Sequence, residues 1–231
     1  MSTATSVVTR QGLSVGIATG AYGISFGALA VAAGLDVWQT CALSLLMFTG
    51  GSQFAFVGVL GAGGSGLAAG ATAGLLGARN ALYSLQMAPL LALHGASLRD
   101  RLRKVAAAQL TIDESTAVAL AQDDPTVQRR GFWVTGLAVF VLWNVFTLAG
   151  AVLGETLGDP RDWGLDGAAA AAFLALLWPR LKAHQAPVVA AASALVAVVA
   201  VPLAPPGVPV LAAACVAAAI ALGRRRPEPG T

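Results

Sequence analysis

The sequence predicts an all-α membrane protein with about seven transmembrane helices, folded as one polytopic domain over residues 1–231. Three observations predict this class. Hydrophobic residues make up 57% of the chain and charged residues only 11%, whereas a soluble domain carries about 25% charged residues. Apolar segments close to the length needed to cross a bilayer recur along the chain. Basic residues collect at the ends of these segments, which is typical of membrane proteins.

The first apolar segment, residues 11–33, is rich in glycine, and Tyr22 and Ser25 interrupt it. A cleaved signal peptide has a shorter apolar core, so we expect this segment to be retained as a span. The second segment, 37–60, contains the run Gly50-Gly51-Ser52-Gln53. Adjacent glycines favour unwinding, so this run predicts a helix that is broken near the middle of the membrane.

The third segment, 67–93, carries Arg79, the one permanent charge between Val37 and Leu98. A charge at the bilayer centre costs about 3 kcal/mol. Arg79 is therefore expected to face a protein partner, a water-filled cavity or an anionic ligand.

The next segment, 97–122, differs from its neighbours. It begins with a capping sequence at Ser97, and its apolar residues Leu98, Leu102 and Val105 share one helical face between basic residues. This is the pattern of an amphipathic helix at the membrane interface. Because basic clusters flank the segment on both sides, we expect it to be re-entrant or interfacial rather than to cross alone.

Four further apolar segments follow, at 131–157, 165–181, 187–202 and 207–223. If the N-terminus lies outside and the C-terminus inside, eleven of the fourteen Lys and Arg residues fall on the inner side, which is the orientation the positive-inside rule favours. Gly-Leu-Asp occurs at 34–36 and again at 164–166. These features fit an inverted repeat of two three-helix halves, 11–93 and 131–202, joined by 97–122. The alternative is that glycine-rich spans resemble one another by composition alone.

Two polar clusters inside apolar segments are candidates for binding a polar ligand. Residues Gly50, Gly51, Ser52 and Gln53 offer freed backbone groups and an amide, or else pack closely against a neighbouring helix. Arg79 shares its helix with Asn80 and Tyr83. The arginine either binds a substrate carboxylate with two parallel hydrogen bonds or forms an ion pair with Asp113 or Glu114.

Asp113 and Glu114 form an acidic pair in apolar surroundings. One interpretation is structural: Thr111 caps a helix and Glu114 closes the capping box. The other is that the two carboxylates bind protons or substrate. The chain lacks phosphate-binding glycine loops, metal-ligand spacing and nucleophile triads. We therefore expect no enzyme activity, no metal, no cofactor and no nucleic-acid partner.

Several motifs together resemble the AzlC family over about residues 12–223. They are Tyr22 to Gly27, Gly34-Leu35, Phe48 to Phe54, Arg79 to Ser84, Asp113-Glu114, Trp143 with Gly150 and Gly154, Gly164-Leu165-Asp166 and Phe173-Leu174-Ala175. The resemblance implies the large subunit of a bacterial branched-chain amino acid exporter. It also implies a multi-pass location in the inner membrane, a small hydrophobic AzlD-type partner, no cofactor, and export of leucine, isoleucine and valine, with methionine as a further candidate.

The chain departs from the family pattern in its polar patch, where Gly77 and Asn80 stand at the outer positions around Arg79. This departure bears on the choice of substrate more than on the transporter class. A different class of function is a membrane scaffold or sensor subunit that transports nothing. Leucine efflux from cells fed with dipeptides would distinguish the two.

Overall fold

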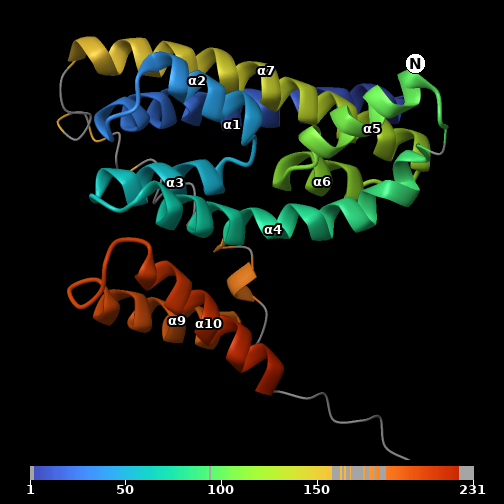
Figure 1. Ribbon diagram of the computed structural model, residues 1–231. Helices are drawn as coiled ribbons and strands as arrows, with labels where there is room; N and C mark the ends of the chain where they lie inside the picture. The colour runs from blue at the N-terminus through green and yellow to red at the C-terminus, as the bar shows by residue number, and fades with distance from the viewer. Residues whose placement is uncertain are drawn as a thin grey trace, which may run out of the picture.

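The computed structural model describes residues 3–93, 95–157, 162, 164, 167, 174, 177–178, 180–182 and 186–223. Every regular element in these residues is helical, which confirms the predicted all-α class (Figure 1). The elements are α1 (Thr3–Ala32), α2 (Val37–Leu46), α3 (Gly51–Gly61), α4 (Gly66–Leu91), α5 (Leu98–Leu110), α6 (Asp113–Leu120), α7 (Pro125–Leu157), η2 (Arg180–Lys182), α9 (Ala186–Ala200) and α10 (Val208–Gly223).

Helices α1 and α7 pack side by side along most of their length (Figure 1). Glycines at nearly every turn of α1 allow this, since small residues let two helix backbones approach closely. The register is parallel: Gly12 lies against Thr135, Gly16 against Ala138 and, further along both helices, Gly27 against Thr147. Of the described helices, these two are long and apolar enough to cross a membrane.

The parallel register corrects the predicted topology. That topology made residues 11–33 and 131–157 run in opposite directions, as they must if they begin two inverted halves. The structure pairs them in the same direction, so the halves 11–93 and 131–202 are not inverted copies that begin with these two helices. Of the seven predicted spans, two correspond to described helices that are both long and apolar enough to cross a membrane, and α4, which covers the third, has 26 residues. Most of 165–181 lies outside the described residues.

Helices α2 and α3 form a hairpin that begins and ends beside the C-terminal end of α1. Asp36 starts α2 by accepting a 2.7 Å hydrogen bond from the backbone N–H of Gln39. The chain then breaks between α2 and α3, where Gly50 adopts a φ of +42°, a conformation that favours glycine. Helix α3 returns until Gly61 lies against Ala33. The predicted break is confirmed, but segment 37–60 turns back instead of spanning.

Helix α4 runs back toward the start of α7, where Arg129 Nε donates a 2.7 Å hydrogen bond to the carbonyl of Leu90. A second hairpin follows, made of α5 and α6. Ser97 caps α5 in a capping box with Asp100, as the sequence predicts. The hairpin ends beside the N-terminal ends of α1 and α7, where Val118 contacts Gly131. Residues 97–122 therefore leave and return at one end of the bundle.

The α5–α6 break differs in detail from the predicted capping box. Ile112, not Thr111, occupies the N-cap position of α6, and the hydroxyl of Thr111 donates to the Ala107 carbonyl instead. Ser115 closes the break, since its hydroxyl accepts from the Ile112 N–H and donates to the Leu110 carbonyl at 2.6 Å. The structural interpretation of Glu114 as a capping residue is therefore wrong, and its side chain is left for another role.

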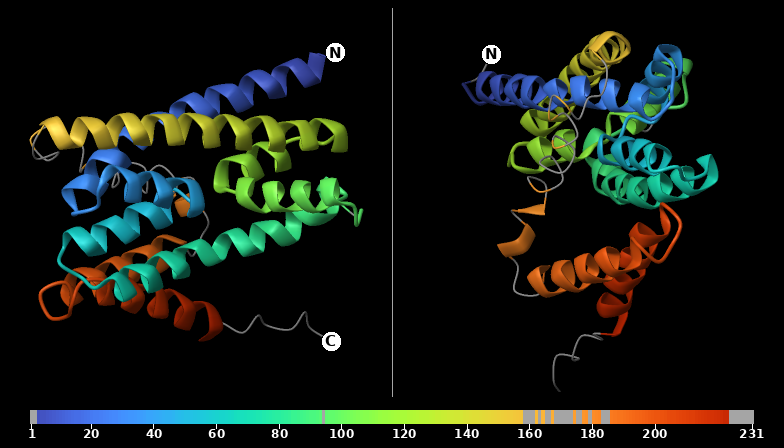
Figure 2. Two further views of the ribbon diagram at one scale, coloured as in Figure 1. Left: turned by 45° about the horizontal axis from the view of Figure 1, so that its top comes forward. Right: turned by 90° about the vertical axis from the view of Figure 1, so that its left-hand side faces the viewer.

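The two hairpins enter from opposite ends of the α1–α7 pair and meet at their tips (Figure 2, left). Gln109 Nε2, near the end of α5, donates a 2.7 Å hydrogen bond to the carbonyl of Leu45 near the end of α2. An aromatic core fills the space around the tips, with Phe26, Phe54 and Trp143 in mutual ring contact. Helices α9 and α10 pack on each other, and the turn before α10 places Gly207 against Ala68 and Thr72 of α4.

We predict that Gly27→Ala destabilises the protein, because the added methyl group would meet the backbone of Thr147 and Ala151. Overpacking of this kind costs about 1–3 kcal/mol. Gly70→Ala is the matched control, since a Cβ at Gly70 in α4 meets nothing within 4 Å and alanine favours a helix by about 0.8–1 kcal/mol over glycine. Thermal unfolding of the purified full-length chain should show a lower midpoint for the first variant only. Equal midpoints would mean that α1 and α7 do not pack this closely.

We also predict that the N-terminus is cytoplasmic. The structure brings Arg10, Arg129, Arg130 and the basic start of α5 to one end of the bundle, here called the basic end. The positive-inside rule puts that end in the cytoplasm. Reporters fused before residue 3 and after Ala121 should be active only as cytoplasmic fusions, and a reporter after Leu157 only as a periplasmic one. Periplasmic activity at the N-terminus would restore the orientation expected from the sequence alone.

Candidate functional site: a cavity between two helix breaks

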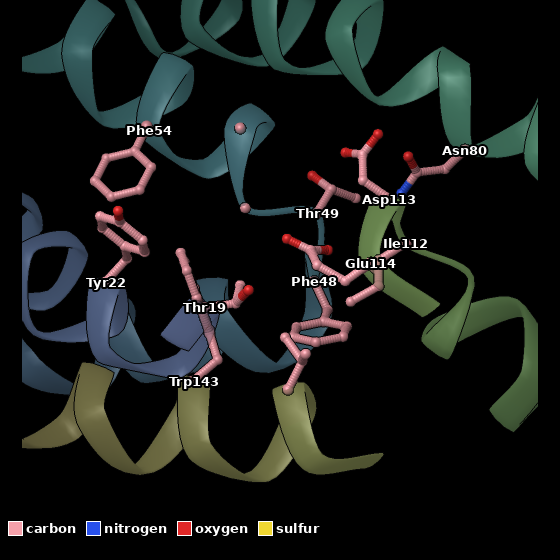
Figure 3. A pocket seen from close by; sticks show the side chains of 13 residues that line it. Thr19, Tyr22, Phe48, Thr49, Phe54, Asn80, Ile112, Asp113, Glu114 and Trp143 are labelled. Atoms are coloured by element: carbon pink, nitrogen blue, oxygen red, sulfur yellow. The ribbon is translucent and has the colours of Figure 1, made fainter. Parts of the chain in front are cut away.

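A cavity of about 210 Å³ lies where the two hairpin tips meet the α1–α7 pair (Figure 3). Its walls come from five helices and from both breaks. The lining residues are Thr19 and Tyr22 of α1, Phe48, Thr49 and Gly50 of the first break, Gly51 and Phe54 of α3, Asn80 of α4, Ile112, Asp113 and Glu114 at the second break, and Val139 and Trp143 of α7. The breaks thus position the cavity.

One side of the cavity is aromatic. Figure 3 shows Tyr22 and Phe54 facing each other, with Trp143 beside them. The Phe54 and Trp143 rings meet edge to face with their centroids 6.1 Å apart, and Phe26 supports Trp143 from behind at 6.0 Å. Such packing fixes the rings in place. This wall can bury an aliphatic group.

The rest of the lining is polar, and several of its atoms have no partner. Thr49 Oγ1, Asn80 Oδ1 and Trp143 Nε1 are buried and make no hydrogen bond within the described residues. Buried polar groups are normally hydrogen-bonded, and each exception calls for an explanation. These three atoms give the cavity one acceptor, one donor and one hydroxyl group with which a polar guest, whether water or a solute, can form hydrogen bonds.

Backbone geometry adds to this polarity. Helix α3 begins at Gly51 and helix α6 at Asp113, and both residues line the cavity. The first N–H groups of a helix have no partner within the helix. They also carry the positive end of the helix dipole, which attracts anions. The two breaks therefore present two positive helix ends to one small space.

Arg79 reaches this region from α4 and forms an ion pair with Asp113. Its Nη2 lies 2.7 Å from Asp113 Oδ2, and the Tyr83 hydroxyl donates to Asp113 Oδ1 at 2.7 Å. Of the two roles that the sequence left open for Arg79, the structure shows the ion pair. Asp113 lines the cavity, while Arg79 and Tyr83 hold it from outside the lining.

Glu114 lines the cavity beside Asp113, and Figure 3 shows its carboxylate directed toward the first break. It forms no ion pair within the described residues, where Arg79 to Asp113 is the pair present.

The structure brings together five of the nine residues predicted for the site: Gly50, Gly51, Asn80, Asp113 and Glu114. Gln53 is fully buried outside the lining, and its Nε2 donates to the carbonyls of Leu43 and Ser44 at 3.4 and 3.3 Å. Ser52 is also buried outside the lining.

Sequence reasoning missed the contributions of α1 and α7, above all Tyr22 and Trp143. Both residues were named in the family motifs but not assigned to the site. The signal for Trp143 is its position in the middle of an apolar segment, because tryptophan in a membrane helix is commonest at the interfaces.

We predict that Arg79→Met and Asp113→Leu are each strongly destabilising and that the double variant is less so. Removing one partner of a largely buried pair leaves a lone charge and costs about 3–5 kcal/mol, whereas replacing both with apolar residues is often neutral. The yield of monodisperse full-length protein should fall in each single variant and recover in the double variant. A double variant that loses as much as the two singles combined would show that the pair does not act as a unit.

The chain was compared with family models, curated proteins and solved structures. No curated protein and no solved structure matches the chain. A family model described as AzlC protein matches residues 14–157, which include most of α1, both hairpins, α4 and α7 and every residue that lines the cavity. This family is associated with branched-chain amino acid transport. The match covers more than half of the chain and confirms the resemblance found in the sequence, and the chain is a membrane protein that belongs to the AzlC family.

Proposed function

We propose that this chain is the transport subunit of a secondary exporter of branched-chain amino acids in the bacterial inner membrane. The observation that carries the proposal is the cavity between the two breaks, with its aromatic wall and its unpartnered polar atoms. Broken helices that meet around a polar site are typical of secondary transporters. The family association supplies the substrate class.

The size of the cavity fits a small solute. Its volume of about 210 Å³ is below the range of about 300–1,000 Å³ that is common for drug-sized ligands. An amino acid has a charged head and a short side chain, and the cavity offers a polar lining and an aromatic wall. Apolar pockets distinguish one methylene by only about 1–3 kcal/mol. Leucine, isoleucine, valine and methionine should therefore all be accepted.

The arrangement of the hairpins suits alternating access. Residues 3–61 consist of a long helix followed by a hairpin, and so do residues 66–120. The first hairpin starts at the C-terminal end of α1, and the second starts near the opposite, basic end. We assign the inverted repeat to these two units, which places the cavity at their interface, as in other inverted-repeat transporters. A small AzlD-type subunit is the proposed partner.

The decisive experiment measures export. Cells that produce the chain with its small partner, fed with dipeptides, should release leucine, isoleucine, valine and methionine faster than cells without the chain. A scaffold or sensor would leave release unchanged. If none of the four leaves faster while another solute does, the substrate class is wrong even though the chain transports.

A variant on the cavity lining, with a control variant in the same helix, tests whether export depends on the cavity. Gly51→Leu places a bulky side chain at the start of α3, on the lining, and should abolish release while the protein stays in the membrane. Gly58→Leu is the control in the same helix, because Gly58 is exposed and a Cβ there meets nothing within 4 Å. Normal release by the Gly51 variant would show that the first break serves packing and not transport.

A further inference from the structure

The charges around the cavity are not balanced, and this bears on how a zwitterion would sit in it. Two carboxylates line the cavity, Asp113 and Glu114. Arg79 supplies the nearby positive charge and is paired with the first of them. The Tyr83 hydroxyl binds the second oxygen of Asp113. Both oxygens of Asp113 are thus engaged on the side of α4, which leaves Glu114 as the acidic group that faces the cavity.

Glu114 can bind a cation. A carboxylate on the wall of a cavity is stabilised by a paired positive charge. Within the described residues no ion pair forms at Glu114. Tyr22, Thr49 and Asn80 share the lining with it, and none of them carries a positive charge. The start of α6 gives Glu114 the partial positive charge of a helix end, and the ammonium group of an amino acid in the cavity would add a full positive charge.

The first break offers hydrogen-bond donors for the carboxylate of an amino acid. Helix α3 begins at Gly51, so its first N–H groups and its positive dipole end lie on the cavity lining. A second donor stands nearby on α7: Trp143 is only 3% exposed, and its Nε1–H has no acceptor within the described residues. Indole N–H groups donate and never accept. These donors suit a carboxylate, and they suit it without Arg79.

We infer that the cavity binds an amino acid with its ammonium group on Glu114, its carboxylate at the first turn of α3 and the Trp143 indole, and its aliphatic side chain against Phe54 and Tyr22. This inference rests on the proposed function and specifies its binding site. It places the ligand carboxylate away from Arg79, because Arg79 lies outside the cavity lining and its Nη2 is paired with Asp113.

Three probes separate the parts of the ligand. Leucine has both charges, 4-methyl-2-oxopentanoate lacks the ammonium group, and 3-methylbutylamine lacks the carboxylate. A ligand that binds only the native state raises its thermal stability, and at a fixed ligand concentration the increase grows with the logarithm of the affinity. The unfolding midpoint of the purified full-length chain, measured with each probe at the same concentration, therefore reports binding. The wild-type chain should be stabilised most by leucine.

Glu114→Gln should lower the affinity for leucine and for the amine at least tenfold and leave the affinity for the oxo acid unchanged. Trp143→Phe should do the reverse: it should weaken leucine and the oxo acid and spare the amine. The opposite selectivity of the two variants also shows that each is folded. Glu155→Gln, which removes an exposed carboxylate near the end of α7, is the control and should change nothing.

Each of the other possible results would contradict one part of the proposed binding mode. If Glu114→Gln leaves leucine binding intact, or weakens all three probes equally, the assignment of the ammonium group to Glu114 is wrong while the exporter proposal stands. If Arg79→Lys selectively weakens the oxo acid, the carboxylate lies at Arg79 instead. If the wild-type chain responds to none of the probes, the proposed function falls together with the inference.

Discussion

The close parallel contact between α1 and α7 is the constraint on which the rest of the fold depends. Helix α1 ends at one end of the bundle and α7 begins at the other, so the chain between them must cross an odd number of times. Helix α4 makes that crossing. The other two segments between α1 and α7 leave and return at the same end as hairpins, which keeps the number of crossings odd. The glycines that allow the contact therefore restrict the topology as well as the packing.

A hairpin tip inside the bundle leaves backbone groups that need partners, because lipid offers none. Each break solves this with a side chain from its own returning helix. Gln53 donates to the carbonyls of Leu43 and Ser44 at the end of α2, and Ser115 donates to the carbonyl of Leu110 at the end of α5. Irregular backbone is tolerated at membrane depth where it is buried in protein or lines a cavity. Both conditions hold at these tips, which explains why the two breaks and the cavity occur together.

Local features of this fold could be predicted from the sequence, but the direction in which each helix runs could not. The paired glycines predicted the first break, and Ser97 predicted the start of α5, because both effects act over a few residues. Hydropathy shows that segment 37–60 is apolar, but it does not show that the segment turns back. Counting that segment as a crossing reversed the side assigned to Arg10 and the direction of α1 relative to α7. For segment 97–122 the basic flanks argued against a crossing and left a re-entrant or an interfacial arrangement open.

The site was predictable to the same extent. Gly50, Gly51, Asn80, Asp113 and Glu114 stand out as polar or glycine residues in apolar segments, and they line the cavity. Tyr22 and Trp143 do not stand out to the same degree, since their importance comes from which helices pack together. The sequence left two roles open for Arg79 because either a ligand or Asp113 satisfies a guanidinium. Only the fold places Asp113 within 2.7 Å of it.

Several contacts near the cavity hold its helices in place without lining it, and the ion pair of Arg79 is one of them. Arg79 and Tyr83 attach the start of α6 to α4, and Gln109 attaches the end of α5 to the end of α2. The first hairpin is attached to α7 by the hydrogen bond from Ser44 to Thr147 and by the ring contact of Phe48 with Phe140. None of these links involves the glycines that join α1 to α7. The two hairpin tips that line the cavity are therefore held to α4, to α7 and to each other by contacts separate from the glycine contacts between α1 and α7.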